Sequence, residues 1–306
     1  MKLCHFTDLF DLSSHDARNL LARAVALKAE DRAGHRTAIL QGRTLGLLFE
    51  KPSLRTRVSF EAAIARLGGS AIFLRGKDVG LGVRESTADF ARVISQYVDV
   101  LAVRTFSQRT IDELARHASV PVVNALSDTA HPCQAMADVL TIHEEFGRVE
   151  GLKVVFVGDG NNVARSLALA TTLLGAKFVL ASPRGYEFPG DFQLGFAERF
   201  LGVPLVFEHD PARAVDSADV VYTDVWASMG QEHEAEDRRR SFAPFQVDAA
   251  LMKHAKPSAI LLHCLPARRG EEVVSDVLDG PQSRVIPQAA NRLHFQKALL
   301  CRLLGV

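Results

Sequence analysis

Short runs of apolar residues alternate with longer amphipathic stretches along the whole chain. Some runs are almost entirely apolar, as at 154–157 (Val-Val-Phe-Val). Such runs are typical of parallel strands that are covered on both faces. The alternation predicts an α/β fold with doubly wound parallel sheets. The predicted strands are Thr44–Phe49, Ala71–Leu74, Val98–Val103 and Pro121–Ala125, followed by Leu152–Gly158, Lys177–Ala181, Pro204–Glu208, Asp219–Thr223, Ala259–His263 and Arg284–Pro287.

The two series of strands indicate two domains joined by a helix rather than by a loop. The segment His131–Phe146 carries apolar residues at helical spacing, and Gly147 ends the pattern. A length of 306 residues is enough for two domains of ordinary size. We place the first domain at 1–140 and the second at 141–290, and we expect a final helix at Ala290–Leu304.

The charge balance limits the possible partners. Lys+Arg and Asp+Glu both number 36, so the formal net charge is zero, whereas a general nucleic-acid-binding chain should be basic. We therefore expect no nucleic acid as a partner, and any bound anion must be held by a local cluster of positive groups. The charged segment Glu232–Ser241 is interpreted as a solvated loop.

The sequence shows none of the usual signals for export or membrane insertion. No apolar run approaches the ~20 residues that a membrane span needs, so we expect no membrane partner. The N-terminus lacks a signal-peptide core, and Asp8 and Asp11 argue against a transit peptide. The cysteines are too sparse for a disulfide scaffold, and none pairs at a metal-ligand spacing. We expect a cytoplasmic protein with reduced cysteines and no metal. The cysteines are Cys4, Cys133, Cys264 and Cys301.

The segment 53–57 (Ser-Leu-Arg-Thr-Arg) follows the first predicted strand and opens a helix. Ser53 stands where an N-cap residue belongs. The first turn of a helix offers free N–H groups and the positive end of the helix dipole, which together suit a phosphate. Arg55 and Arg57 would oppose that dipole by themselves, so an anionic partner accounts for them better than a capped surface helix does.

Two more polar segments come directly after buried strands. Arg104 directly follows the third predicted strand, and His131 and Gln134 lie beyond the fourth. The carboxyl ends of parallel strands form the edge where α/β proteins bind ligands. His131 could donate to a carbonyl oxygen, and Gln134 offers both a donor and an acceptor. We predict that these groups share one edge with the segment 53–57.

These three segments resemble the carbamoyl-phosphate site of the aspartate/ornithine carbamoyltransferase family. The resemblance implies an enzyme in which an amine attacks the carbamoyl carbon, and negative charge then builds on the carbamoyl oxygen. Arg104 and His131 would stabilise that oxyanion. The implied ligands of carbamoyl phosphate are Ser53, Leu54 through its backbone, Arg55 and Thr56 for the phosphate, Arg104 between phosphate and carbamoyl oxygen, and His131 and Gln134 for the carbamoyl group.

The second half of the chain opens with a glycine-rich turn at 158–162 (Gly-Asp-Gly-Asn-Asn) between a strand and a helix. A dinucleotide-binding motif would require a third glycine, and Val163 stands in its place. A nicotinamide-dependent oxidoreductase is therefore an alternative from another class, supported by an incomplete motif.

Three later segments, 222–232, 263–272 and 291–292, are similar to the amine-acceptor motifs of the ornithine branch of the family. Asp224 can pair with an ammonium group. Cys264 can hydrogen-bond the reacting amine, although most cysteines are small buried apolar residues. The resemblance implies that Asn162, Asp224, Ser228 and Met229 hold the α-amino and α-carboxylate groups, and that Cys264, Leu265 and Arg292 line the reacting centre.

The resemblance covers nearly the whole chain, with six segments in the same order. It implies two α/β domains with a cleft between them, and a C-terminal helix at 291–306 that returns to the first domain. The implied substrates are carbamoyl phosphate and L-ornithine, without a cofactor. The products would be L-citrulline and phosphate, made by a homotrimer or a multiple of trimers.

Two positions depart from the family pattern. Leu54 stands where the family usually has threonine, so one hydroxyl is missing, while the backbone N–H groups remain. In the segment 77–80 (Lys-Asp-Val-Gly), a loop that usually carries glutamine and reaches a neighbouring subunit has Asp78 instead. A carboxylate close to a phosphate is unfavourable. Either Asp78 points away from the site, or Lys77 or Arg84 substitutes for the glutamine.

Other acceptors and a protein without activity are the remaining alternatives. N-acetylornithine and N-succinylornithine carry no charge on the α-nitrogen, which would leave Asp224 unpaired. Putrescine has no carboxylate and no α-amine, so the segment Ser228–Gly230 would have no purpose. A binding module without activity would be expected to lose Arg55, Arg104, His131 or Cys264, and all four are present.

Overall fold

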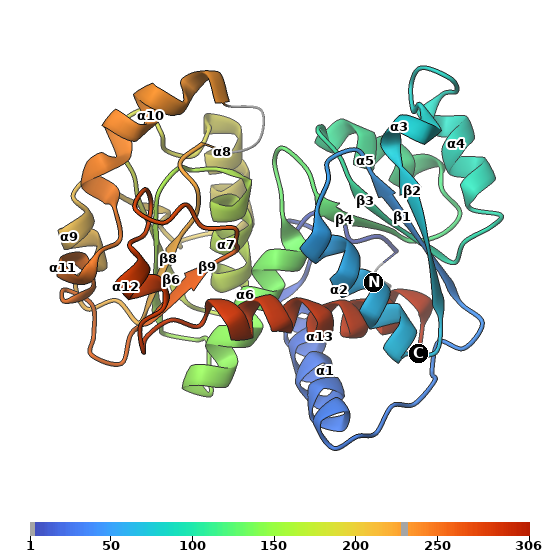
Figure 1. Ribbon diagram of the computed structural model, residues 1–306, viewed down its shortest axis with the longest axis horizontal. Helices are drawn as coiled ribbons and strands as arrows, with labels where there is room; N and C mark the ends of the chain where they lie inside the picture. Colours follow the sequence, from blue (N-terminus) through green and yellow to red (C-terminus); the bar gives the residue numbers. More distant parts are fainter. Residues whose placement is uncertain (1–3, 228–231) are drawn as a thin grey trace. The chain divides into compact units, whose positions relative to one another are not determined.

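The computed structural model describes residues 4–227 and 232–306. The chain forms two compact units, which Figure 1 shows in the colours of the sequence. Unit 1 comprises Met1–Leu140 and Asn291–Val306, and unit 2 comprises Thr141–Ala290. Each unit contains one parallel sheet with helices, so the predicted α/β fold is confirmed. Among the described residues, no helix combines the length and the apolar composition that crossing a membrane would require.

The sheet of unit 1 has four parallel strands in the order β2-β1-β3-β4. Residue Phe49 of β1 is paired with Arg104 of β3, and Arg104 is paired with Leu126 of β4. The three chain segments that follow these strands therefore leave the sheet at one edge. The strands are β1 Thr44–Phe49, β2 Ser70–Arg75, β3 Val100–Arg104 and β4 Val122–Leu126; the helices are α1 Ser14–Arg32, α2 Leu54–Arg66, α3 Gly76–Val79, α4 Thr87–Ile94, α5 Gln108–His117 and the first part of α6 Pro132–Phe146.

The central strands of this sheet are buried along almost their whole length. Every residue of β3 is buried, as are five of the six residues of β1. Leu48, Leu101 and Val103 pack in one core cluster with Ile111 and Leu114 of α5. Burial on both faces explains why these strands show continuous apolar runs rather than alternation.

The sheet of unit 2 has five parallel strands in the order β7-β6-β5-β8-β9. Val157 of β5 is paired with Thr223 of β8, which is paired with His263 of β9, so their carboxyl ends share an edge. The elements are β5 Lys153–Val157, α7 Asn162–Leu173, β6 Lys177–Ala181, α8 Gly190–Arg199, β7 Val206–Glu208, α9 Pro211–Val215, β8 Val220–Thr223, η1 Glu232–Glu234, α10 Ala235–Phe242, η2 Ala243–Phe245, α11 Ala249–Met252, β9 Ile260–His263 and α12 Ser275–Leu278.

The strand predicted at Arg284–Pro287 is wrong, because helix α13 (Val285–Leu304) begins there. Pairing with β9 is limited to an isolated bridge between Leu261 and Ser283. Pro287 lies in the first turn of α13, where a missing N–H leaves no helical hydrogen bond unmade. A short apolar run next to proline is compatible with a strand or with the start of a helix. Here the helix begins at Val285, five residues earlier than the expected Ala290.

The solvated loop predicted at Glu232–Ser241 is also wrong, because most of this segment forms α10. Opposite charges spaced four residues apart, such as Glu236 and Arg240, lie 2.6 Å apart and favour the helix. Arg238 is buried on this helix, and its guanidinium bonds Asp159 at 2.8 Å and the carbonyl oxygen of Trp226 at 3.0 Å. The charge run therefore contains one buried cation that anchors the helix to the β5–α7 turn.

The part of α13 within unit 1 is fastened to α1 and α2 by buried polar groups. Lys297 on α13 lies 2.8 Å from the carboxylate of Asp31, which also accepts from Arg66 at 3.2 Å. Lys28 donates to the side-chain oxygen of Asn291 at 2.6 Å. These interactions hold α13 beside α1 and beside the carboxyl end of α2, which ends at Arg66.

One histidine in this cluster should make the stability of the protein depend on pH. The pKa of His294 falls from 6.5 to about 4. Burial lowers it most, the positive charges of Lys28, Lys297 and Arg66 lower it further, and the negative charge of Asp31 raises it. The unfolded chain therefore takes up this proton first as the pH falls. The stabilisation is complete above pH 6.5 and is lost as the pH falls towards 4.

We expect the free energy of unfolding to fall by about 1 kcal/mol between pH 7 and pH 5 through this histidine, allowing for its partial exposure. Urea unfolding of the wild type and of His294→Asn at both pH values measures the effect. The variant should lose less stability over this interval than the wild type. An equal loss in both proteins would contradict the assignment to His294.

Candidate active site

Ser53 caps helix α2 as predicted. Its backbone is extended, and its hydroxyl oxygen accepts a hydrogen bond from the backbone N–H of Thr56 at 3.3 Å. The hydroxyl of Ser53 in turn donates to the hydroxyl oxygen of Thr56 at 3.0 Å. The first turn of α2 contains no acidic residue. Its free N–H groups and positive dipole thus remain available to an anion.

Arg292 reaches this turn from α13. Its guanidinium Nη2 donates to the hydroxyl oxygen of Thr56 at 2.7 Å, and both side chains are buried. The sequence assigned Arg292 to the reacting centre together with ornithine-site residues. Within unit 1 the structure places it directly against the predicted phosphate-binding turn, so its positive charge adds to that of the helix dipole.

His131, Arg104 and Arg292 lie close enough to influence one another. Burial lowers the pKa of His131 well below 6.5, and the charges of Arg292 and Arg104 lower it further. The imidazole is therefore neutral at physiological pH, and donates through one ring nitrogen only. The two guanidinium charges beside a neutral histidine form a local positive cluster. Because the chain has no net positive charge, binding an anion would require such a cluster.

Lys51 is a member of this region that the sequence reasoning missed. Its side chain is largely buried, with Nζ 4.5 Å from the centre of the Phe106 ring. Burial and the charge of Arg104 lower its pKa, whereas Asp128 and Glu50 raise it. The sequence does contain a signal for Lys51, because it lies between a buried strand and the cap residue Ser53. A lysine at this position is expected near the edge of the sheet where ligands bind.

Gln134 lies in the first turn of α6, where it is almost fully buried. Its side-chain Nε2 donates to Oδ1 of Asp138 at 2.8 Å. The neighbouring Cys133 has a structural role instead: burial raises the pKa of its thiol to about 12, and the thiol donates to the carbonyl oxygen of Asn124 at 3.5 Å.

Not every residue predicted for the phosphate joins this cluster through its side chain. Leu54 is 77% exposed, and Arg55 is also exposed on the first turn of α2. The structure thus brings Ser53, Thr56, Arg104, His131, Gln134 and Arg292 into one region of unit 1. The exposed side chain of Leu54 is consistent with a role limited to its backbone N–H.

In the segment 77–80, the unusual Asp78 forms an ion pair within its own chain. The carboxylate of Asp78 lies 2.6 Å from Nε of Arg75, and Arg84 donates to the backbone carbonyl oxygen of Asp78 at 3.3 Å. The charge of Asp78 is therefore compensated by Arg75 within the same chain. This leaves Lys77 as an exposed cation of the loop.

Asp224 is the centre of the polar cluster in unit 2. It directly follows β8, is 7% exposed, and accepts from Nδ2 of Asn161 at 3.1 Å and from the thiol of Cys264 at 3.1 Å. Asn161 caps α7, because its Oδ1 accepts from the backbone N–H groups of Val163 and Ala164. The cap fixes the amide so that its NH₂ group faces Asp224.

The turn that carries Cys264 and Leu265 is held by a buried histidine. The backbone N–H of Leu265 donates to Nδ1 of His263 at 2.8 Å, so the proton of the neutral ring is on Nε2. Nε2 lies 3.1 Å from the carboxylate of Glu272, and both side chains are fully buried. Leu265 has φ of +56°, a conformation that costs energy for a residue with a branched side chain and needs such support.

Asp224, His263 and Cys264 also form a possible metal-ligand set, because their ligand atoms lie within 4.8 Å of one another. Both ring nitrogens of His263 are already engaged, one with the N–H of Leu265 and one with Glu272. A metal at His263 would have to replace one of these hydrogen bonds. The geometry therefore favours a hydrogen-bonded network over a resident metal.

Of the other residues predicted to bind the amine acceptor, the structure describes Asn162. Asn162 is half-buried at the start of α7, next to Asn161. Ser228 and Met229 lie outside the described residues. The sequence reasoning missed Asn161, Glu272 and Arg238. Asn161 had a recognisable signal as the N-cap after the glycine-rich turn, whereas the partners of Glu272 and Arg238 are visible only in the fold.

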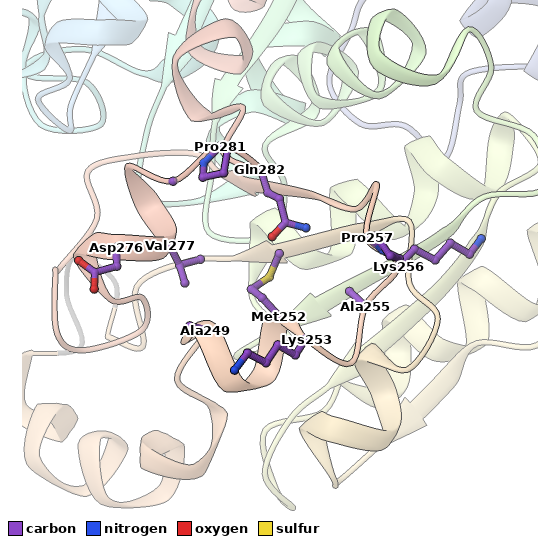
Figure 2. Close-up of a pocket in the computed structure, with 11 residues that line it drawn as sticks. Ala249, Met252, Lys253, Ala255, Lys256, Pro257, Asp276, Val277, Pro281 and Gln282 are labelled. Atoms are coloured by element: carbon purple, nitrogen blue, oxygen red, sulfur yellow. The ribbon is translucent and has the colours of Figure 1, made fainter.

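A separate pocket of about 450 Å³ lies in unit 2 (Figure 2). It is lined by α11, α12 and the chain on either side of them, including Met252, Pro257 and Gln282. Pro257 precedes β9, whereas Cys264 follows it. The pocket is therefore at the amino end of this strand and does not belong to the cluster around Asp224.

Comparisons with known proteins match both parts of the chain. Residues 4–144 match the carbamoyl-P binding domain of aspartate/ornithine carbamoyltransferase, and residues 150–303 match its Asp/Orn binding domain. An ornithine carbamoyltransferase of Pyrococcus abyssi is 52% identical over 300 residues, which cover 97% of this chain and 94% of that protein. An anabolic ornithine carbamoyltransferase of Pyrococcus furiosus is 51% identical over 300 residues, covering 97% and 95%.

A solved structure extends this similarity to the fold. The ornithine carbamoyltransferase structure from Pyrococcus furiosus superimposes with a TM-score of 0.95 at 49% sequence identity. The match covers 100% of this chain and 99% of that one. The similarity therefore includes the parallel sheet and the helices of each unit.

Proposed function

Since the chain belongs to the aspartate/ornithine carbamoyltransferase family, we propose that it transfers the carbamoyl group of carbamoyl phosphate to the δ-amine of L-ornithine, producing L-citrulline and phosphate. Identity of about 50% to several ornithine carbamoyltransferases over nearly the whole chain supports this acceptor. The word anabolic in the name of one relative supports a place in arginine biosynthesis. The buried positive cluster around Thr56, Arg104 and Arg292 is the observation that carries the proposal.

Unit 1 would bind carbamoyl phosphate through the first turn of α2. The free N–H groups there, with the hydroxyls of Ser53 and Thr56, can hold the phosphate oxygens. Arg292 donates to Thr56 and brings its positive charge beside the phosphate. Arg55, exposed on the same turn, would add a guanidinium once an anion is present. No metal or cofactor is needed to neutralise the phosphate in this arrangement.

Arg104 and His131 would stabilise the transition state. The attacking amine forms a C–N bond to the carbamoyl carbon and pushes electrons onto the carbamoyl oxygen. Arg104 and the N–H of the neutral His131 would donate to this oxyanion. When the carbonyl re-forms, the C–O bond to phosphate breaks and phosphate leaves with the electron pair. The nitrogen gives up its extra proton to the departing phosphate.

Unit 2 would orient ornithine through Asp224 and the turn at Cys264. Asp224 offers a buried carboxylate to the α-ammonium group, and Asn162 lies beside its partner Asn161. Cys264 can accept a hydrogen bond from the δ-amine, since its own proton is directed to Asp224. Only the neutral δ-amine has a lone pair for attack, so hydrogen bonding at this sulfur would favour the reactive form.

Acylated ornithines and putrescine remain the alternative acceptors to be tested. Asp224 already accepts hydrogen bonds from Asn161 and Cys264, so an acylated α-amine would not leave it without partners. The discrimination must then depend on charge: a buried carboxylate gains more from an ammonium group than from a neutral amide. Free ornithine supplies that charge at the α-position.

An acceptor panel tests the proposal directly. Citrulline or the corresponding carbamoyl product, and phosphate, are measured with carbamoyl phosphate and one acceptor at a time: ornithine, N-acetylornithine, N-succinylornithine, putrescine or aspartate. We expect kcat/KM for ornithine to exceed the others at least 100-fold, in line with the loss of a buried polar partner. A preference for any other acceptor would overturn the ornithine assignment but not the carbamoyl transfer.

We also propose that the active form is a homotrimer or a multiple of it, working in the cytoplasm. Large apolar side chains of unit 1 are exposed in the single chain, among them Leu54 at 77%, Val58 at 51% and Val83 at 90%. Apolar surface of this kind is typical of an interface between protein chains. The four cysteines are free, which suits a reducing compartment.

A further inference from the structure

We propose that Asp138 is a positioning residue that fixes the orientation of the Gln134 amide, and that this orientation lets the site distinguish a carbamoyl group from an acetyl group. The inference rests on the proposed function and concerns the recognition of its acyl phosphate. It assigns a task to the fully buried carboxylate of Asp138.

The two side chains are neighbours on one face of α6, four residues apart. Gln134 is 1% exposed and Asp138 is fully buried. Nε2 of Gln134 donates to Oδ1 of Asp138 at 2.8 Å. A carboxylate has no proton to give, so only the NH₂ end of the amide can face it. Hydrogen bonds to a charged acceptor are stronger than neutral ones, which makes the reversed amide unfavourable.

Fixing the NH₂ end determines what the other end of the amide offers. Oε1 of Gln134 is buried and has no hydrogen-bond partner among the described residues. A buried carbonyl oxygen without a donor is unfavourable, and a ligand that brings an N–H removes this penalty. Gln134 therefore presents an acceptor, and not a donor, to the carbamoyl group.

The surrounding groups complete the complementarity. The backbone N–H of Gln134 donates to the carbonyl oxygen of His131, the residue before α6, at 3.1 Å, so the two residues meet at the first turn of this helix. The charge of Arg104 acts on the imidazole of His131, so the guanidinium lies near this turn. A carbamoyl group has an oxygen that accepts and an NH₂ that donates. Donors from Arg104 and an acceptor from Gln134 match these two ends.

Acetyl phosphate is the ligand that exposes this effect. It carries a methyl group in place of the NH₂ and has nearly the same size and the same phosphate. Bound in this site, it would leave Oε1 of Gln134 buried without a donor. We expect the wild type to bind acetyl phosphate about 10- to 100-fold more weakly than carbamoyl phosphate for this reason.

The test compares three ligands in calorimetric titrations without ornithine: carbamoyl phosphate, acetyl phosphate and inorganic phosphate. Asp138→Asn keeps the shape of the side chain but allows the Gln134 amide to turn over, because an asparagine can donate as well as accept. Carbamoyl phosphate should bind about 10-fold more weakly to this variant, while acetyl phosphate and inorganic phosphate change little. The KM for ornithine should stay the same. Asp276→Asn, an exposed carboxylate on α12, is the matched control and should change none of these values.

Two results would overturn the proposal. One is an unchanged ratio of the affinities for carbamoyl and acetyl phosphate in folded Asp138→Asn. The other is an equal loss for all three ligands, which would show that Asp138 merely supports α6. If Asp138→Asn does not fold, Gln134→Met is tested instead, because it removes Oε1. This variant should weaken the binding of carbamoyl phosphate alone. Equal weakening of the binding of all three ligands would count against the proposal. These titrations do not need turnover, so failure of the acceptor panel would be a separate result.

Discussion

Replacing Arg104 with alanine should lower kcat about 100- to 1,000-fold, which corresponds to about 3–4 kcal/mol of lost transition-state stabilisation. Arg104 is buried at the end of β3, where register with β1 sets it beside the segment that leads to Ser53. Its charge is fixed, and it acts on the neutral His131. The oxyanion would lose its strongest donor, and the remaining imidazole cannot replace the charge.

Steady-state kinetics with saturating ornithine measure this effect, with the phosphate released as the signal. Arg109→Ala, an exposed arginine on α5, is the matched control and should retain the wild-type rate. Arg104→Lys should recover little of the loss, because an ammonium group does not reproduce the guanidinium geometry. A rate near that of the wild type in Arg104→Ala would show that the reaction centre lies elsewhere.

Replacing Asp224 with alanine should raise the KM for ornithine about 100-fold, since removing one partner of a buried charge pair typically costs about 2–5 kcal/mol. The substitution also leaves Asn161 and Cys264 without their shared acceptor. Carbamoyl phosphate binding should remain unchanged, because its proposed ligands belong to unit 1.

Separate titrations of the two substrates distinguish this result from general damage. Asp224→Asn should fall between the wild type and Asp224→Ala, because it keeps an oxygen acceptor and loses the charge. Asp276→Ala changes an exposed carboxylate in the same unit and should leave both affinities intact. An equal loss of affinity for ornithine and carbamoyl phosphate in Asp224→Ala would remove the basis for placing the α-amine at this residue.

Both predictions depend on residues that follow the carboxyl ends of parallel strands. Arg104 ends β3, Asp224 follows β8, and Cys264 follows β9. Within each sheet these ends share an edge, so polar residues of the same unit that are distant in the sequence meet there. The hydrophobic pattern located the strands, and this rule then indicated which polar residues belong together.

The sequence alone determined the features that depend on short stretches of chain. The predicted strands include all nine strands found among the described residues. Continuous apolar runs indicated the central ones, such as β1, β3 and β5, because burial on both faces excludes polar residues locally. The cap at Ser53 was recognisable because it depends on four consecutive residues. The same local reasoning misassigned Arg284–Pro287 and the charged segment Glu232–Ser241, where a short run or a charge cluster is compatible with more than one element.

Only the tertiary structure decided which distant side chains meet. Arg292 donates to Thr56 across 236 positions of the sequence, and Asn161, which the sequence did not single out, bonds Asp224. Such pairs depend on strand register and helix packing, which a short stretch of sequence does not contain. The amide orientation of Gln134 likewise needed the distance to Asp138, since the spacing of four residues permits the contact and only the fold shows that it forms.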